Sequence, residues 1–249
     1  MEQVIIISLL SGLATGLGGL IVIWFGRPTQ KILGFYLGIS TGMMGMVVLV
    51  DLIPASLQYG NIIYTVIGLS LGITIMFLFD ISFKKFFKGN KKSNLTLGEN
   101  DHNFYKRLGY FMTFAIALHN IPEGLAIGAG FESQVELGTR VALVIALHNV
   151  PEGLGVASTL YLGRLPNRLV FLLPLTTGFF IPIGTMISEL FAEFIPYWIS
   201  IGLSLAAGAM GYVVIKDIGP ETLRLNRLFG QVGIGIGILI LYVVYHLNG

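Results

Sequence analysis

Eight stretches of this chain are each apolar over about the 20 residues that a helix needs to cross a bilayer. They cover residues 4–25, 32–52, 62–83, 108–130, 139–162, 169–191, 197–215 and 228–247. Hydrophobic residues make up 54% of the chain and charged residues only 11%, against about 25% charged in soluble domains. Strands of membrane barrels are shorter and alternate in polarity. The sequence therefore predicts an all-α polytopic membrane protein with eight transmembrane helices.

The positions of the basic residues predict how these helices are oriented. With the N-terminus outside, fourteen Lys and Arg residues fall in inside connections and only Arg140 falls outside. Both termini are then extracytoplasmic, and we expect an integral protein of the plasma (inner) membrane. The start lacks a basic n-region and a small-residue cleavage site, so we interpret it as a retained first span. The chain has no cysteine, which excludes disulfides, thiolate metal sites and cysteine catalysis.

An internal repeat links the second and seventh spans. At an offset of 166 residues, Gly42, Met44, Gly45, Val47, Val48, Asp51, Pro54 and Leu57 align with Gly208, Met210, Gly211, Val213, Val214, Asp217, Pro220 and Leu223. These two spans are antiparallel, which predicts an inverted repeat with a 3+2+3 arrangement of helices. We expect one domain over 1–249: spans 1–3 in 1–83, a cytoplasmic loop at 84–107, spans 4–5 in 108–162, and spans 6–8 in 169–249. Transporters are often built this way.

Two nearly identical polar motifs interrupt the fourth and fifth spans. They read His119-Asn120-Ile121-Pro122-Glu123-Gly124 and His148-Asn149-Val150-Pro151-Glu152-Gly153. On a helix, residues four apart leave the same face, and ionisable groups at membrane depth usually mark a functional site. If the two faces meet, His119, Glu123, His148 and Glu152 form an N2O2 cage. This ligand set suits Zn, Fe, Co, Ni, Cd or Mn better than Mg or Ca.

Other readings of these motifs remain open. A membrane histidine can be structural and hydrogen-bonded across helices. Asn120 and Asn149 can each be a metal ligand or an interhelical hydrogen-bonding group. Each proline removes a backbone hydrogen bond, which predicts a bend beside each histidine, and the following Gly124 and Gly153 predict close backbone approach.

Acidic residues outside the motifs are also candidates for the transport pathway, and Asp51 and Glu189 are the two that we favour. Asp51 and Asp217 are expected at the cytoplasmic ends of spans two and seven, and Asp51 has no Lys or Arg near it in sequence. Glu189 is expected near the outer end of span six, where it could receive cations.

This pattern resembles the ZIP (Zrt-/Irt-like) family of divalent metal transporters over the whole chain. The resemblance implies uptake of zinc, iron or related ions into the cytoplasm, and a homodimer. It also implies that His119, Glu123, His148 and Glu152 form the primary metal site, with Asn120 and Asn149 completing a second one. Some relatives add a glutamate from span six; here Ile181 stands at that position.

We therefore predict a transporter of divalent transition metals, zinc first, with iron, cadmium and manganese as alternatives. It would work by alternating access, with one repeat rocking against the other. The metal is substrate, no resident cofactor is required, and the partners are metal ions, lipid and a second copy, not nucleic acid. The protein is not expected to be an enzyme. The alternative is an intramembrane zinc-dependent hydrolase, because a catalytic zinc keeps three protein ligands and an open position.

Overall fold

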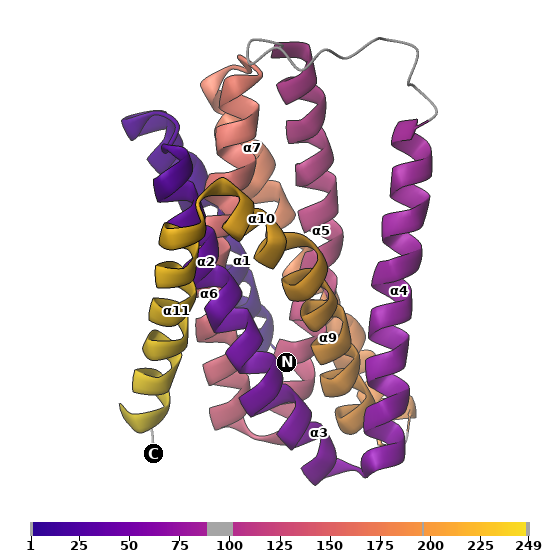
Figure 1. Ribbon diagram of the computed structural model, residues 1–249. Coiled ribbons are helices and arrows are strands. Elements are labelled where there is room, and N and C mark those ends of the chain that lie inside the picture. The colour runs from indigo at the N-terminus through magenta and orange to yellow at the C-terminus, as the bar shows by residue number, and fades with distance from the viewer. Residues whose placement is uncertain (1, 89–101, 196, 248–249) are drawn as a thin grey trace.

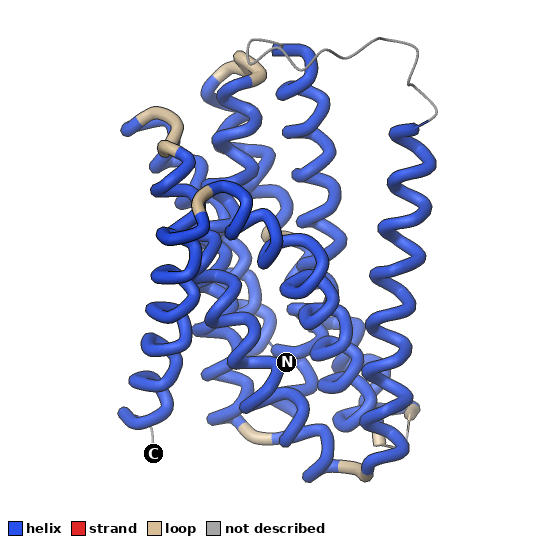
Figure 2. Tube along the Cα trace, viewed as in Figure 1, coloured by secondary structure: helices blue, strands red, loops and turns tan. Residues whose placement is uncertain are grey.

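The computed structural model describes residues 2–88, 102–195 and 197–247, and in these ranges it contains helices and turns but no strand (Figures 1 and 2). The prediction of an all-α fold is confirmed. The α-helices are α1 (Glu2–Phe25), α2 (Gln30–Met46), α3 (Ile53–Tyr59), α4 (Ile62–Lys88), α5 (His102–Ser133), α6 (Val135–Leu162), α7 (Asn167–Thr177), α8 (Phe180–Phe194), α9 (Trp198–Val213), α10 (Gly219–Leu225) and α11 (Arg227–Leu247). Two π-helical segments connect some of these helices: η1 (Val47–Leu52) connects α2 to α3, and η2 (Val214–Ile218) connects α9 to α10.

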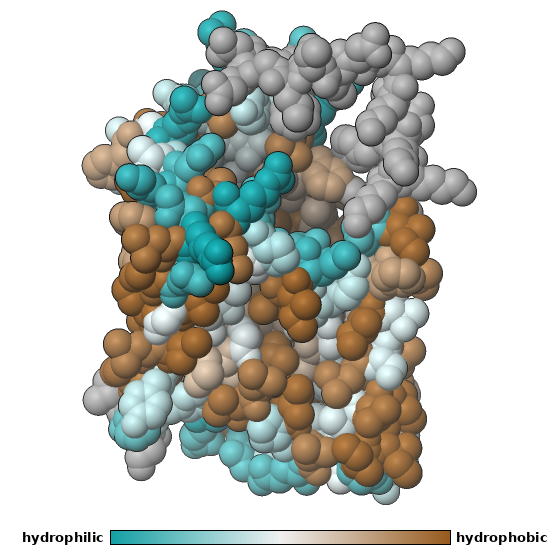
Figure 3. All heavy atoms as spheres, viewed as in Figure 1, coloured by the Kyte–Doolittle hydropathy of each residue, from teal (hydrophilic) through white to brown (hydrophobic). Residues whose placement is uncertain are grey.

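Seven helices or helix runs in the described ranges are long and apolar enough to cross a membrane. The predicted fourth span lies in α5, which is outside that set. Its 32 residues reach about 48 Å at 1.5 Å per residue, which is ample for a crossing. Because α5 carries the polar motif and a basic first part, its mean hydropathy is lower than that of its neighbours. Figure 3 shows apolar side chains over the middle and lower part of the visible face, with polar side chains at its lower end and from its upper left towards the middle.

Both ends of the predicted loop at 84–107 are helical. Helix α4 continues to Lys88 and α5 begins at His102, while residues 89–101 lie outside the described ranges. The end of the molecule where α4 ends and α5 begins is called the basic side below. The opposite end, where α1 begins and α11 ends, is called the termini side (Figure 1).

Three of the spans are interrupted, and proline accounts for each interruption. In η1 the Ile53 N–H bonds to the Val48 carbonyl, five residues back, just before Pro54; in η2 the Gly219 N–H bonds to the Val214 carbonyl just before Pro220. Because proline has no N–H to continue the regular ladder, the preceding turn widens to a π-helix. The sixth span divides into α7 and α8 around Gly178, and Pro182 lies in the first turn of α8, where its missing N–H is tolerated.

The helices pack as two bundles. Helices α1, α5, α6, α7 and α8 contact one another extensively and are called the site bundle. Helices α2, α3, α4, α9, α10 and α11, with η1 and η2, form the frame bundle, in which α2 packs on α11 and α4 on α9. The bundles meet where α5 contacts α9 and where α2 contacts α6.

This division differs from the expectation that each repeat forms a rocking body. Within the site bundle, Gly12 of α1 lies against Gly178 at the end of α7; a Cβ on Gly12 would be only 2.1 Å from the Gly178 carbonyl oxygen. Within the frame bundle, Gly42 of α2 faces the Ile234 carbonyl of α11 at 2.3 Å by the same measure. Such small-residue contacts let helix backbones pack closely. They join elements of the first repeat to elements of the second, so neither repeat packs as a separate body.

Candidate metal centre

All six polar residues of the two motifs lie inside the protein. His119, Asn120 and Glu123 are on α5, and His148, Asn149 and Glu152 are on α6. Each is at most 4% exposed. Helical spacing aims each triplet to one side of its helix, and the packing of α5 against α6 brings the two sides together. Pro122 and Pro151 lie within these helices, which continue through both motifs.

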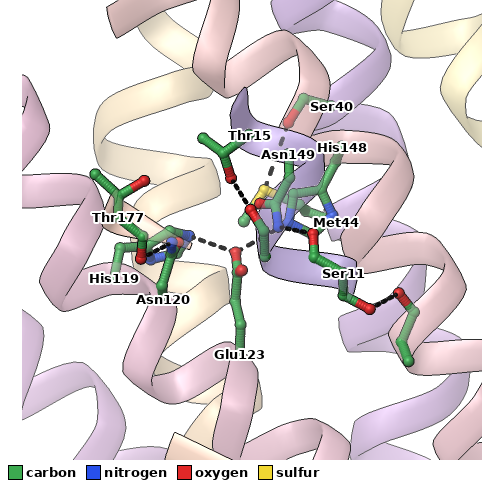
Figure 4. Close-up of polar contacts among 12 residues, drawn as sticks. Ser11, Thr15, Ser40, Met44, His119, Asn120, Glu123, His148, Asn149 and Thr177 are labelled. Atoms are coloured by element: carbon green, nitrogen blue, oxygen red, sulfur yellow. Dashed lines mark hydrogen bonds and ion pairs between the residues drawn. The ribbon is translucent and has the colours of Figure 1, made fainter. Parts of the chain in front are cut away.

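The carboxylate of Glu123 lies between the two imidazoles. Its Oε1 atom is 2.9 Å from His148 Nε2 and 3.2 Å from His119 Nε2. Glu123 therefore links its own helix to α6, as Figure 4 shows. Ligand atoms of His119, Glu123 and Glu152 all lie within 4.8 Å of one another, a spacing that one metal ion could bridge, and these are the only described His, Cys, Asp or Glu residues that form such a group. His148 joins through its contact with Glu123.

Eight buried side-chain nitrogen and oxygen atoms in the described ranges lack a hydrogen-bond partner, and all eight belong to these six residues. They include both carboxylate oxygens of Glu152, the second oxygen of Glu123 and the amide oxygens of Asn120 and Asn149. Burying a polar group without a partner costs about 1–3 kcal/mol, and more for a charged group. A bound cation could satisfy the lone pairs of these buried nitrogen and oxygen atoms.

The two asparagines are held by backbone carbonyls of other helices. Asn120 Nδ2 donates to the Thr177 carbonyl at 2.8 Å, and Asn149 Nδ2 donates to the Ser11 carbonyl at 3.0 Å (Figure 4). Since the amide nitrogen is occupied, the oxygen of each side chain is left as a free acceptor. Ser11 and Thr177 were not singled out from the sequence. They are 166 residues apart, which is the offset of the internal repeat, so identifying either residue would have pointed to the other.

The glycine that ends each motif makes a close backbone contact, as predicted. A Cβ on Gly124 would lie 2.0 Å from the Ile181 carbonyl oxygen of α8, and a Cβ on Gly153 would lie 1.9 Å from the Thr15 carbonyl oxygen of α1. No side chain fits at these distances, because real Cβ atoms essentially never approach within 3.0 Å. The two glycines thus let α5 and α6 approach α8 and α1 beside the polar cluster. Ile181 itself is buried and offers no ligand.

The predicted position of Asp51 at the same end as Asp217 is wrong, whereas its candidate role in the transport pathway stays a prediction. Asp51 lies at the termini side, whereas Asp217 lies at the basic side. The two spans run in opposite directions and each carries its aspartate towards its own C-terminal end, so the two aspartates lie at opposite ends of the molecule. Asp51 also has a basic partner, since Arg140 Nη2 of α6 lies 2.9 Å from its Oδ1. The Tyr245 hydroxyl of α11 donates to the other oxygen. Sequence proximity could not reveal Arg140 or Tyr245, which lie 89 and 194 residues away.

Glu189 lies in the second half of α8, where it is half-buried. It does not belong to the group of residues whose ligand atoms converge at the α5–α6 interface. The structure therefore brings together the six motif residues and leaves both predicted pathway acids outside the cluster.

Comparison with known proteins identifies similar sequences along most of the chain. The family model described as "ZIP Zinc transporter" matches residues 88–244. Proteins named zinc transporter ZupT are among the relatives. The one from Stenotrophomonas maltophilia (strain R551-3) is 29% identical over 96% of this chain and 93% of its own length. Those of Akkermansia muciniphila and Chlorobaculum parvum are 30% and 31% identical, over 97% and 94% of this chain and 96% and 91% of their own lengths.

Proposed function

This chain belongs to the ZIP zinc transporter family and is a divalent metal transporter, and from that premise we propose that the six buried motif residues bind its cargo. His119, Glu123 and Glu152 would supply the first ligands, and His148 would join them once a metal ion displaces its contact with Glu123. The amide oxygens of Asn120 and Asn149 would complete the site or support an adjacent ion. The observation that carries this assignment is the set of eight unpartnered buried atoms, all from these six side chains.

The chemistry of this donor set favours a transition metal, and the relatives' names favour zinc. Two carboxylates balance the charge of a dication, which removes most of the cost of holding it away from water. Imidazole and carboxylate together suit Zn, Fe, Co, Ni, Cd and Mn, whereas Mg and Ca prefer oxygen ligands alone. Because the chain has no thiolate, the site would release its ion more readily than a structural zinc site does.

The hydrolase alternative is not supported, since the matching family and the relatives are transporters. Every ionisable group in the α5–α6 cluster is already accounted for as a metal ligand. No separate general base is left within it.

We extend the proposal to direction and topology. Metal would move into the cytoplasm, with both termini outside, in a plasma-membrane homodimer. The excess of Lys and Arg on the inside connections supports this orientation. Transport would occur by alternating access, with the site bundle moving against the frame bundle. The inverted repeat supports such exchange, because Ser11 and Thr177 make equivalent contacts to Asn149 and Asn120 at the repeat offset.

Zinc uptake into proteoliposomes tests the proposed site. We expect the wild-type protein to accumulate zinc, and the double variant Glu123→Gln with Glu152→Gln to lose nearly all uptake while remaining folded. The matched control is Glu136→Gln with Glu193→Gln, two exposed acids outside the cluster, which should leave uptake unchanged. Equal uptake by the wild-type protein and the Glu123/Glu152 variant would overturn the assignment.

A further inference from the structure

Buried apolar residues of the two bundles pack together on the termini side of the metal centre. The larger buried apolar cluster contains residues of both bundles, among them Met44 and Leu52 of the frame bundle and Ile127 and Ile145 of the site bundle. Ile127 and Ile145 lie between the motifs and the termini side, because Ile127 follows the motif on α5 and Ile145 precedes the motif on α6. The second buried cluster, nearer the basic side, contains site-bundle residues alone, such as Val22, Ala157 and Val170. The structure is therefore closed towards the termini side.

A polar contact reinforces this closed side. Asp51 of η1 is 3% exposed and accepts from Arg140 Nε at 3.0 Å, with Arg140 Nη2 at 2.9 Å from the same oxygen. The Arg140 guanidinium also lies 4.9 Å from the centre of the Tyr245 ring. Asp51 and Tyr245 belong to the frame bundle, whereas Arg140 belongs to the site bundle. It lies on α6, two turns before His148, so the contact acts directly on a helix that carries half of the metal centre.

The corresponding place on the basic side has different chemistry. At the repeat offset of 166, Asp217 corresponds to Asp51 and Phe79 corresponds to Tyr245. Between the two motifs the offset is 29 residues, so Phe111 corresponds to Arg140. Neither Phe79 nor Phe111 can donate a hydrogen bond or carry a positive charge. The ring of Phe79 instead lies 6.2 Å from that of Phe114. The residues equivalent to Arg140 and Tyr245 therefore cannot repeat the side-chain contacts that these two make with Asp51.

From these contacts between the bundles we propose that Asp51, Arg140 and Tyr245 form a latch that holds the termini side closed and must separate before the metal centre opens to that side. The latch goes beyond the proposed function but rests on its alternating access. Asp51 is almost fully buried, so it needs the Arg140 charge whenever the bundles are together. Once they part, water can replace that partner. The latch therefore biases the protein towards the state that is closed at the termini side.

Thiol labelling tests the latch without any need for metal flux. The chain has no cysteine, so a single reporter can be introduced cleanly. Ala129→Cys suits this purpose because Ala129 is fully buried on α5 and faces Gly202 of α9, across the boundary between the bundles on the termini side. A second reporter, Ala157→Cys, lies in the cluster confined to the site bundle and reports whether a variant remains folded. Labelling by a membrane-impermeant maleimide is measured in proteoliposomes containing EDTA.

Each latch variant has an expected labelling rate. Arg140→Gln should speed labelling at Ala129→Cys by about tenfold, because it leaves Asp51 buried without a charge partner whenever the bundles close. Asp51→Asn should have a smaller effect, since the Arg140 side chain is 26% exposed and can turn to water. Combining Asp51→Asn with Arg140→Gln should label more slowly than Arg140→Gln alone, because the two residues act as a pair. The matched control is Arg224→Gln, which breaks the exposed ion pair with Glu221 inside α10 and should change nothing.

The outcomes separate the latch from the proposed function. If Arg140→Gln labels at the wild-type rate, or if the double variant is simply additive, the latch is wrong even when zinc uptake is intact. If the wild-type protein accumulates no zinc but the labelling pattern holds, the proposed function fails and the contact between the bundles stands. If Arg140→Gln also exposes Ala157→Cys, that variant is unfolded. The milder Tyr245→Phe then decides, with faster labelling at Ala129→Cys supporting the latch and wild-type labelling refuting it.

Discussion

Replacing Gly153 by alanine tests whether close backbone packing sets the geometry of the metal centre. The added Cβ would lie 1.9 Å from the Thr15 carbonyl oxygen, whereas real Cβ contacts essentially never fall below 3.0 Å. Helix α1 must therefore retreat from α6 by about 1.1 Å, because the atom met is backbone and cannot rotate away. Overpacking of this kind costs about 1–3 kcal/mol. It also moves α6 relative to α1, whose Ser11 carbonyl holds Asn149.

We expect Gly153→Ala to lower both the melting temperature in detergent and the affinity for zinc. Ligand groups must be held within about 0.5 Å of their working positions, so a shift of 1.1 Å should weaken zinc binding by at least about tenfold in calorimetry. The matched control is Gly45→Ala on α2, where a Cβ meets nothing within 4 Å. That change should stabilise the protein slightly, by about 0.5–1 kcal/mol, because alanine favours the helix. A Gly153→Ala variant as stable as Gly45→Ala, with wild-type zinc affinity, would refute the packing argument.

Three further outcomes follow from the same contacts. Zinc at a hundred times its dissociation constant should stabilise the wild-type protein by about 2.7 kcal/mol in thermal melts. The double variant Glu123→Gln with Glu152→Gln should show no such stabilisation. Equal stabilisation of that variant would place zinc binding elsewhere. Asn149→Ala removes both the hydrogen bond to the Ser11 carbonyl and the free amide oxygen, so it should lower the free energy of unfolding by about 1–2 kcal/mol and weaken zinc binding. An Asn149→Ala variant with the wild-type zinc affinity in calorimetry would exclude this oxygen from the site. Ser56 bonds Thr65 and Ser200 inside the frame bundle, so Ser56→Ala should lower the melting temperature but leave zinc affinity intact. A loss of affinity would contradict the assignment of the metal centre to the site bundle.

The sequence was most informative where its pattern is local. Helical spacing alone placed His119 and Glu123 on one face, and the matching motif on the next span implied that His148 and Glu152 face them. The contact between Glu123 and His148 agrees with this expectation. Hydropathy located the spans, because a long apolar helix in a bilayer has few alternatives. It placed some ends too early, since the helix runs Gln30–Tyr59 and Trp198–Leu225 continue beyond the predicted ends at residues 52 and 215.

Contacts between distant helices were beyond such reasoning. The carbonyls of Ser11 and Thr177 belong to the backbone and leave no side-chain pattern to read. The Asp51–Arg140 pair joins residues that are far apart in sequence, and the assignment of Asp51 to the cytoplasmic end ignored the reversed direction of its span. The repeat pointed to symmetry but not to how its halves interlock. The grouping of helices into bundles depends on glycine contacts such as Gly12 with Gly178, which only the fold reveals.

Anomalous scattering from crystals of the protein soaked in zinc or cadmium tests the central claim most directly. The account predicts a peak between α5 and α6, with imidazole nitrogens and carboxylate oxygens of the two motifs as ligands at about 2.0–2.2 Å for zinc. The peak should vanish in the Glu123→Gln, Glu152→Gln double variant. A metal peak away from these six residues, or one that persists when both glutamates are replaced, would contradict the account.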